Sequence, residues 1–116
     1  MNNKQLGTAF EREICRELKE KGWWVHFLNP DNSGAQPFDI IAVKEGLAMA
    51  VDAKTSSTCK FSINRLEDNQ IMAFDKWLRC GNFMPQIAVK YKDRIIWITY
   101  YELKKNKVID LREKLK

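Results

Sequence analysis

The chain has 116 residues, of which 45% are hydrophobic and 30% are charged, and its formal net charge is +5. This composition is that of a soluble folded protein and excludes a disordered tail, and the length predicts one domain over residues 1–116. The excess of Lys and Arg favours a polyanionic partner.

Rare residue types exclude several classes of site. The single histidine, His26, excludes metal sites built on several histidines. Three cysteines, far apart and without a Cys-x-x-Cys spacing, argue against a disulfide framework or a zinc ribbon and predict reduced thiols, as in the cytoplasm. The sequence contains no run of 18 apolar residues, the length that a membrane span needs, so we expect no membrane partner. An enzyme with this composition must rely on carboxylates and lysines.

Apolar residues spaced four apart predict a helix over residues 4–21, which Gly22 ends. Residues 23–28 are rich in β-forming side chains and predict a first strand. Residues 29–37 combine Asn, Pro, Asp, Ser and Gly and predict a loop.

Two apolar runs, residues 38–43 and 47–54, predict a hairpin that turns around residues 44–46. The polar stretch 55–63 predicts irregular structure. A second helix is predicted to follow, because Asn64 is a good N-cap and Glu67 stands three residues later as a capping-box partner.

The remaining sequence predicts a second hairpin from residues 84–91 and 94–100, and a basic, weakly helical tail over residues 102–116. The expected order of elements is therefore α-β-β-β-α-β-β-α. This order predicts an α/β fold with a central mixed five-stranded sheet flanked by helices.

The second strand of the first hairpin carries an acid and a lysine two residues apart. Side chains alternate along a strand, so Asp52 and Lys54 share one face. The other residues of this strand are apolar, and a buried charge is costly unless it is paired or bound to a metal. The pattern therefore indicates either an ion pair or a metal site.

The register of the hairpin decides whether a second carboxylate joins them. A two-residue loop places Asp39 directly opposite Asp52, with their Cβ atoms about 4.5–5.5 Å apart. Two carboxylates this close repel each other, and a hard divalent cation relieves the repulsion. A three-residue loop would instead place Asp39 opposite Val51. The alternative to a metal site is a surface ion pair beside an acid that ends a turn.

Four stretches, taken in order, resemble the PD-(D/E)XK nuclease superfamily, and more narrowly the archaeal-type Holliday junction resolvases and their RecU-type bacterial relatives. They contain Glu11, then Asp39 in Pro-x-Asp, then Asp52-x-Lys54, and then the start of the second helix. The stretches are GTAFERE, SGAQPFDIIAV, DAKTS and LEDNQI. The resemblance implies a restriction-endonuclease-like core.

The resemblance also implies roles for single residues. Asp39 and Asp52 would hold Mg²⁺ or Mn²⁺, and Glu11 would complete the metal shell directly or through a water. Lys54 would orient or activate the attacking water and offset charge on the phosphorane. Phosphodiester hydrolysis of this kind needs a metal and no histidine, in agreement with the composition.

Two more residues match positions of the family. Gln70 stands where these enzymes often place a glutamine that supports the site, and Ser33 stands at the loop position of a catalytic serine. Asp52 departs from the pattern, because these resolvases more often have Glu there. The 29–37 loop is too short for the projecting stalk of RecU-type enzymes.

The function implied is that of a metal-dependent, structure-selective endonuclease that resolves four-way DNA junctions by paired phosphodiester hydrolysis. The twofold relation of the two scissile strands predicts a homodimer. The alternatives are a nicking or restriction nuclease of the same superfamily, and a protein of this fold that binds nucleic acid without cutting it.

Basic residues near the predicted site are candidates for binding DNA phosphates, although each one taken singly is more typical of a solvated surface. These candidates are Lys4, Arg12, Lys60 and Arg65.

Aromatic residues raise a separate question. The tryptophans, Trp24 among them, are predicted to pack in the core or at a dimer interface, and His26 to be a hydrogen-bonded structural residue. Phe61 is the better candidate for an exposed apolar contact. A dimer could form through residues 95–98 or through the second helix with Met72.

Overall fold

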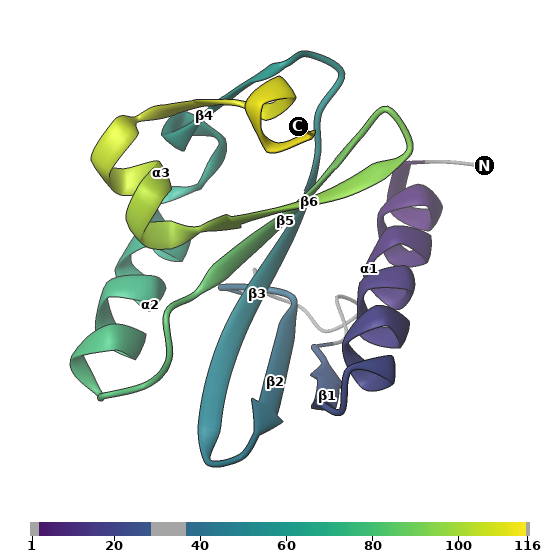
Figure 1. The fold of residues 1–116 in the computed structure, drawn as a ribbon. Coiled ribbons are helices and arrows are strands. Elements are labelled where there is room, and N and C mark those ends of the chain that lie inside the picture. The colour runs from purple at the N-terminus through teal and green to yellow at the C-terminus, as the bar shows by residue number, and fades with distance from the viewer. Residues whose placement is uncertain (1–2, 29–36, 116) are drawn as a thin grey trace.

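The structure is a computed structural model that describes residues 3–28 and 37–115, and only the backbone of residues 3–8. A sheet lies between helix α1 on one side and helices α2 and α3 on the other (Figure 1). No helix in these two ranges is long and apolar enough to cross a membrane. The elements are α1 (Asn3–Glu20), β1 (Trp24–Phe27), β2 (Ile40–Lys44), β3 (Leu47–Thr55), β4 (Lys60–Ser62), η1 (Ile63–Arg65), α2 (Asp68–Arg79), β5 (Gln86–Tyr91), β6 (Arg94–Thr99), α3 (Tyr100–Asn106), β7 (Val108–Asp110) and η2 (Leu111–Leu115).

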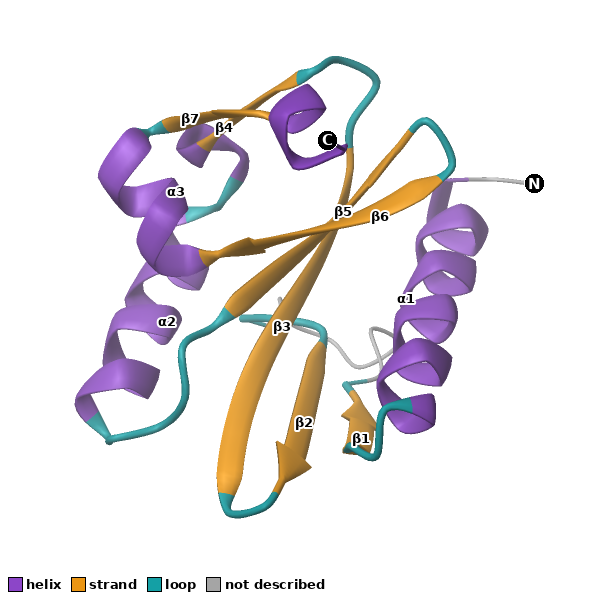
Figure 2. Cartoon of the chain, viewed as in Figure 1, coloured by secondary structure: helices purple, strands orange, loops and turns teal. Residues whose placement is uncertain are grey.

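The main sheet has five strands in the order β1-β2-β3-β5-β6 (Figure 2). Strands β3 and β5 run parallel, and the other neighbours are antiparallel. The predicted mixed five-stranded sheet flanked by helices is therefore confirmed. Because β3 is central, its side chains are covered by helices on both faces.

Each face of the sheet has its own apolar core. The core under α1 contains the predicted helix stripe, with Phe10, Ile14 and Leu18 buried against the sheet. The core on the other face contains a run of aromatic contacts, in which Phe74 of α2 stacks on Phe38 and touches Tyr100. Burial of such side chains stabilises the fold by roughly 1.5–3 kcal/mol each.

Both hairpins turn in two residues. Glu45 and Gly46 have positive φ angles of 51° and 79°, and Lys92 and Asp93 have φ angles of 50° and 61°. Positive φ at both central residues is the type I′ geometry, whose twist matches that of paired strands. The two-residue loop expected from the sequence is thus present at residues 45–46.

The start of the second helix was predicted incorrectly. The Ser62 hydroxyl accepts a hydrogen bond from the Asn64 amide at 3.1 Å and starts a single 3₁₀ turn over Ile63–Arg65. Leu66 is then extended, and α2 begins after Glu67. The capping box is formed by Glu67 and Gln70, three residues later than expected.

A second small sheet was also missed. Strand β4 pairs antiparallel with β7, in segments predicted to be irregular and weakly helical. Three-residue strands that are distant in the sequence leave little periodic signal. The small sheet buries Phe61 completely, so the expectation of an exposed Phe61 is wrong.

Candidate active site

Acidic side chains gather where β2 begins and β3 nears its end. The β2–β3 ladder pairs Lys44 with Leu47 and runs to the pair Ile40 and Val51, as the two-residue loop requires. Asp39 precedes this last pair, and its amide donates to the Val51 carbonyl at 3.0 Å. Its Oδ2 accepts a hydrogen bond from the amide of Ala53 at 2.8 Å. Asp39 therefore contacts the backbone on both sides of Asp52.

Asp52 is a buried acid, with 1% of its surface exposed. Its Oδ1 accepts a hydrogen bond from Gln70 Nε2 at 2.9 Å. Its Oδ2 accepts no hydrogen bond of good geometry from any described residue, although Lys54 Nζ forms an ion pair with it at 3.3 Å. A buried carboxylate oxygen without a donor is costly, and in a functional site it indicates a ligand.

Gln70 links the site to the start of helix α2. Its Oε1 accepts hydrogen bonds from the Glu67 amide at 3.0 Å and from Lys54 Nζ at 3.2 Å, while its Nε2 binds Asp52. One buried amide thus caps a helix and orients both charged residues of β3. The supporting position predicted for Gln70 agrees with this geometry, and it explains why α2 begins at residue 68.

Glu11 reaches the same site from α1, on the other face of the sheet. Its side chain is half-buried, and its pKa is raised to about 7, first by desolvation and then by the negative charge of Asp39. The charge of Asp39 therefore acts on Glu11, and the role of Glu11 in the metal shell stays a prediction.

The negative charge of the two aspartates is only partly compensated by the residues around them. Burial raises the pKa of Asp52 well above its usual range, and the charge of Asp39 raises it further, while Lys54 lowers it. The attraction of one lysine therefore does not offset burial and repulsion.

The donor set fits a hard divalent cation. Asp39 and Asp52 offer carboxylate oxygens, the ligands that Mg²⁺ and Mn²⁺ prefer. Asp52 Oδ2 has no hydrogen-bond donor among the described residues, and Glu11 lies close enough to interact with Asp39. No group of three acid, histidine or cysteine side chains is assembled within residues 9–28 and 37–115, so these residues supply fewer than three preformed ligands. Mg²⁺ commonly completes its shell with waters and substrate phosphates.

The other predicted residues lie apart from this centre or cannot be placed. Ser33 lies outside the described residues, as does the side chain of Lys4. Lys60 pairs with Asp110 at 3.1 Å. Arg65 donates to the Thr55 carbonyl at 2.8 Å and lies 5.3 Å from the Phe61 ring.

Arg12 lies on a stripe of basic side chains along helix α1. Arg12, Arg16 and Lys19 line a groove of about 390 Å³ between α1 and β1, whose floor includes Val25 and Phe27. Their spacing of four and three residues places them on one face of a helix, and this signal was present in the sequence.

Two acids of α1, Glu13 and Glu17, form ion pairs with lysines that do not line this groove. Glu13 pairs with Lys90 at 3.2 Å, and Glu17 pairs with Lys21 at 3.3 Å and accepts a hydrogen bond from the Trp97 indole. The basic residues of the groove have no ion-pair partner among the described side chains, so their charge is available to an anion.

Comparison with known proteins agrees with the geometry. The profile of the archaeal Holliday junction resolvase (Hjc) family matches residues 2–115. The crossover junction endodeoxyribonuclease Hjc of Methanocaldococcus jannaschii is 32% identical over 111 residues, covering 93% of this chain and 78% of the relative. The crossover junction endodeoxyribonuclease Hje of Sulfolobus acidocaldarius is 27% identical over 114 residues, covering 96% and 73%. The solved structure of Archaeoglobus fulgidus Hjc, a Holliday junction resolvase, superposes with a TM-score of 0.71 at 17% identity, covering 92% of this chain and 89% of that one.

Replacing Asp52 with Asn is expected to stabilise the metal-free protein. Asp52 holds its proton more tightly when folded than when unfolded, so its contribution to stability is present below about pH 4 and is lost as the pH rises through the raised pKa. At pH 8, Asp52→Asn should therefore melt about 5 °C higher than the wild type, while at pH 4 the two should melt together.

The control is Asp93→Asn, an exposed acid in a turn. Mg²⁺ at pH 8 should raise the melting temperature of the wild type and of this control, and leave that of Asp52→Asn unchanged. A lower melting temperature for Asp52→Asn at pH 8 would contradict the account of an uncompensated buried charge.

Proposed function

The chain belongs to the archaeal Holliday junction resolvase family, and from this premise we propose that it cuts four-way DNA junctions by divalent-metal-dependent hydrolysis at Asp39 and Asp52. The observation that carries the proposal is the buried Asp52 carboxylate, whose Oδ2 has no described hydrogen-bond donor although Asp39 and Lys54 lie beside it. When both acids are ionised, Lys54 alone does not offset their charge, and a second cation would.

The proposed ligands are Asp39 and Asp52, with Glu11 completing the shell directly or through water. A bound Mg²⁺ or Mn²⁺ would supply Lewis acidity and a water of lowered pKa. Asp39 holds its carboxylate in place through the Ala53 amide, so the ligand position is set by the hairpin backbone.

Lys54 is the proposed partner of the scissile phosphate. Its ammonium group lies 3.3 Å from Asp52 and donates to Gln70, which fixes one end of a flexible side chain beside the acids. A lysine acts on phosphate as a point charge and needs no bidentate geometry. Lys54 can therefore orient a water and stabilise the negative charge that develops on the phosphoryl oxygens.

Junction cutting needs two active sites related by a twofold axis, and we propose a homodimer for this reason. Of the two surfaces considered from the sequence, the β5–β6 hairpin buries Ile96 and Ile98 inside the protomer. Met72 on α2 is 70% exposed, so the α2 surface is the better candidate for the dimer contact.

The groove between α1 and β1 is the proposed path of a DNA backbone. Glu11, in the catalytic centre, directly precedes Arg12, and the stripe of Arg12, Arg16 and Lys19 continues along the helix for about 10 Å. A DNA strand leaving the site along this stripe would place phosphates against cations that have no ion-pair partner among the described side chains. We retain Arg12 as a DNA-binding residue, whereas Lys60 and Arg65 are already engaged within the protein.

Cleavage of a synthetic four-way junction tests the proposed function. Wild type with Mg²⁺ should make paired, symmetric nicks in the junction and leave a linear duplex of matching sequence uncut, and EDTA should abolish the cutting. Asp52→Asn should lower the cleavage rate by about a hundredfold or more and keep junction binding, while Asp93→Asn should cut normally. Equal cutting of both substrates would remove junction selectivity, and binding without cutting would favour a non-catalytic protein.

Salt-dependent binding tests the groove. Removing the charge of Arg16 with Arg16→Gln should weaken binding to junction and duplex alike, and lower the slope of log affinity against log salt by about 1. The control is Lys105→Gln, an exposed lysine on α3, which should leave the slope unchanged. The same slope for the wild type and Arg16→Gln would place the DNA elsewhere.

A further inference from the structure

Two solvent-exposed rings on the edge strand β1 stack on each other. The rings of Trp24 and His26 have centroids 6.1 Å apart and planes 9° apart. Trp24 is 61% exposed and His26 is also exposed. Packing of Trp24 in the protomer core, one of the two roles expected from the sequence, is therefore excluded.

Neither core of the described residues contains these rings. The alternate residues of β1, Val25 and Phe27, pack into the core beneath α1, whereas Trp24 and His26 belong to neither core. No hydrogen bond to His26 comes from any described residue, so its expected structural role is not seen. Two exposed rings that stack at a sheet edge form an aromatic surface that a flat ligand can cover.

The strand register places the rings on the face that carries the acids. His26 lies opposite Ile41, and Trp24 lies opposite Val43. Counting by twos along β2 from Val43 through Ile41 leads to Asp39, so all these side chains share one face. Measured along the strand direction, His26 therefore lies about 7 Å from Asp39, and Trp24 lies about 13 Å from Asp39.

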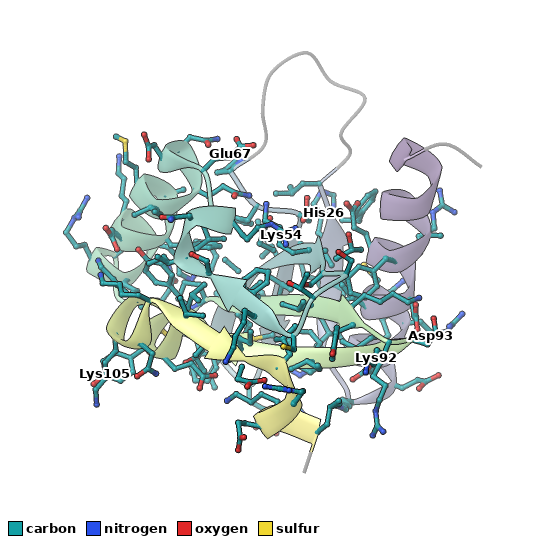
Figure 3. All side chains as sticks on the ribbon, turned by 90° about the horizontal axis from the view of Figure 1, so that it is seen from above. His26, Lys54, Glu67, Lys92, Asp93 and Lys105 are labelled. Atoms are coloured by element: carbon teal, nitrogen blue, oxygen red, sulfur yellow. The ribbon has the colours of Figure 1, made fainter. Side chains whose placement is uncertain are left out.

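The view from above agrees with this placement. Figure 3 shows His26, Lys54 and Glu67 toward one side of the molecule, with Lys92, Asp93 and Lys105 toward the other. His26 and the lysine of the candidate site therefore lie on the same side of the molecule in this view.

On this basis we propose that the Trp24–His26 stack receives a base-pair face exposed at the branch point of the DNA junction. The inference rests on the proposed function and adds a structure-selecting contact to it. A continuous duplex buries every base face against its neighbour, whereas a branch point whose arms are unstacked leaves faces that a flat ring can cover. Every base has such a face, so recognition by stacking is independent of sequence.

A base fits the location better than a second protein does. Anything seated on His26 lies within about 7 Å of Asp39 along the strand direction, next to the bond to be cut. A protein surface docked there would obstruct the entry of DNA to Asp39 and Asp52. DNA bases next to the scissile phosphate would reach the same place without such obstruction.

The test compares Trp24→Ala with Trp24→Phe and with the control Tyr101→Ala, which removes a ring of similar exposure (59%) on α3. Binding is measured in EDTA, where the DNA stays uncut, to a four-way junction and to a linear duplex. Trp24→Ala should bind the junction about tenfold more weakly and the duplex as well as the wild type does. Trp24→Phe should retain most of the affinity, and Tyr101→Ala all of it.

Photo-crosslinking gives a second readout. A 5-bromouracil base at the branch point should crosslink to Trp24, and the same base in the middle of an arm should not. Equal loss of affinity for both DNAs, no loss for the junction, or a change in the sedimenting mass of Trp24→Ala would overturn the inference, the last by assigning the ring to a protein interface. Failure of the wild type to prefer or cut the junction would overturn the proposed function itself, whatever Trp24 does.

Discussion

The buried carboxylate of Asp52 is the constraint on which the rest of the site depends. An acid that is 1% exposed and lies near a second acid, Asp39, is stable only with compensating partners. Gln70 binds one oxygen and Lys54 lies beside the other, yet the pKa of Asp52 remains raised. The fold thus holds a centre that is poorly balanced without a cation. We attribute this imbalance to function, because a neutral side chain in the same place would be less costly.

The two faces of the sheet contribute different parts of the proposed activity. Helix α2 supplies Gln70. The Gln70 side chain is held in position because it accepts a hydrogen bond from the Glu67 amide in the capping box. Helix α1 supplies Glu11 and the basic groove, with its acids Glu13 and Glu17 turned to partners elsewhere. The proposed catalytic residue Glu11 and the proposed DNA-binding residues Arg12, Arg16 and Lys19 therefore lie on the same helix, and a shift of α1 would move both sets.

Much of this arrangement could be predicted from local sequence, and the failures have physical reasons. The turn at Glu45 and Gly46 fixes the hairpin register, and a register fixes which side chains meet. The start of α2 was missed because Asn64 is a good cap in isolation, whereas the buried Gln70 needs tertiary partners that no local pattern shows. Phe61 was expected to be exposed and is buried, and Trp24 lies outside the protomer core, since burial depends on which elements cover a strand.

The central claim is that Asp39 and Asp52 bind a divalent cation next to the scissile phosphate. The most direct measurement is a crystal structure with Mn²⁺ and an uncleavable four-way junction, in which anomalous scattering locates the metal. The account predicts a peak that contacts Asp52 Oδ2 and an oxygen of Asp39, with a DNA phosphate in the same shell and Lys54 beside that phosphate. An ordered junction with Mn²⁺ bound only elsewhere, and Asp52 still held between Gln70 and Lys54, would contradict it.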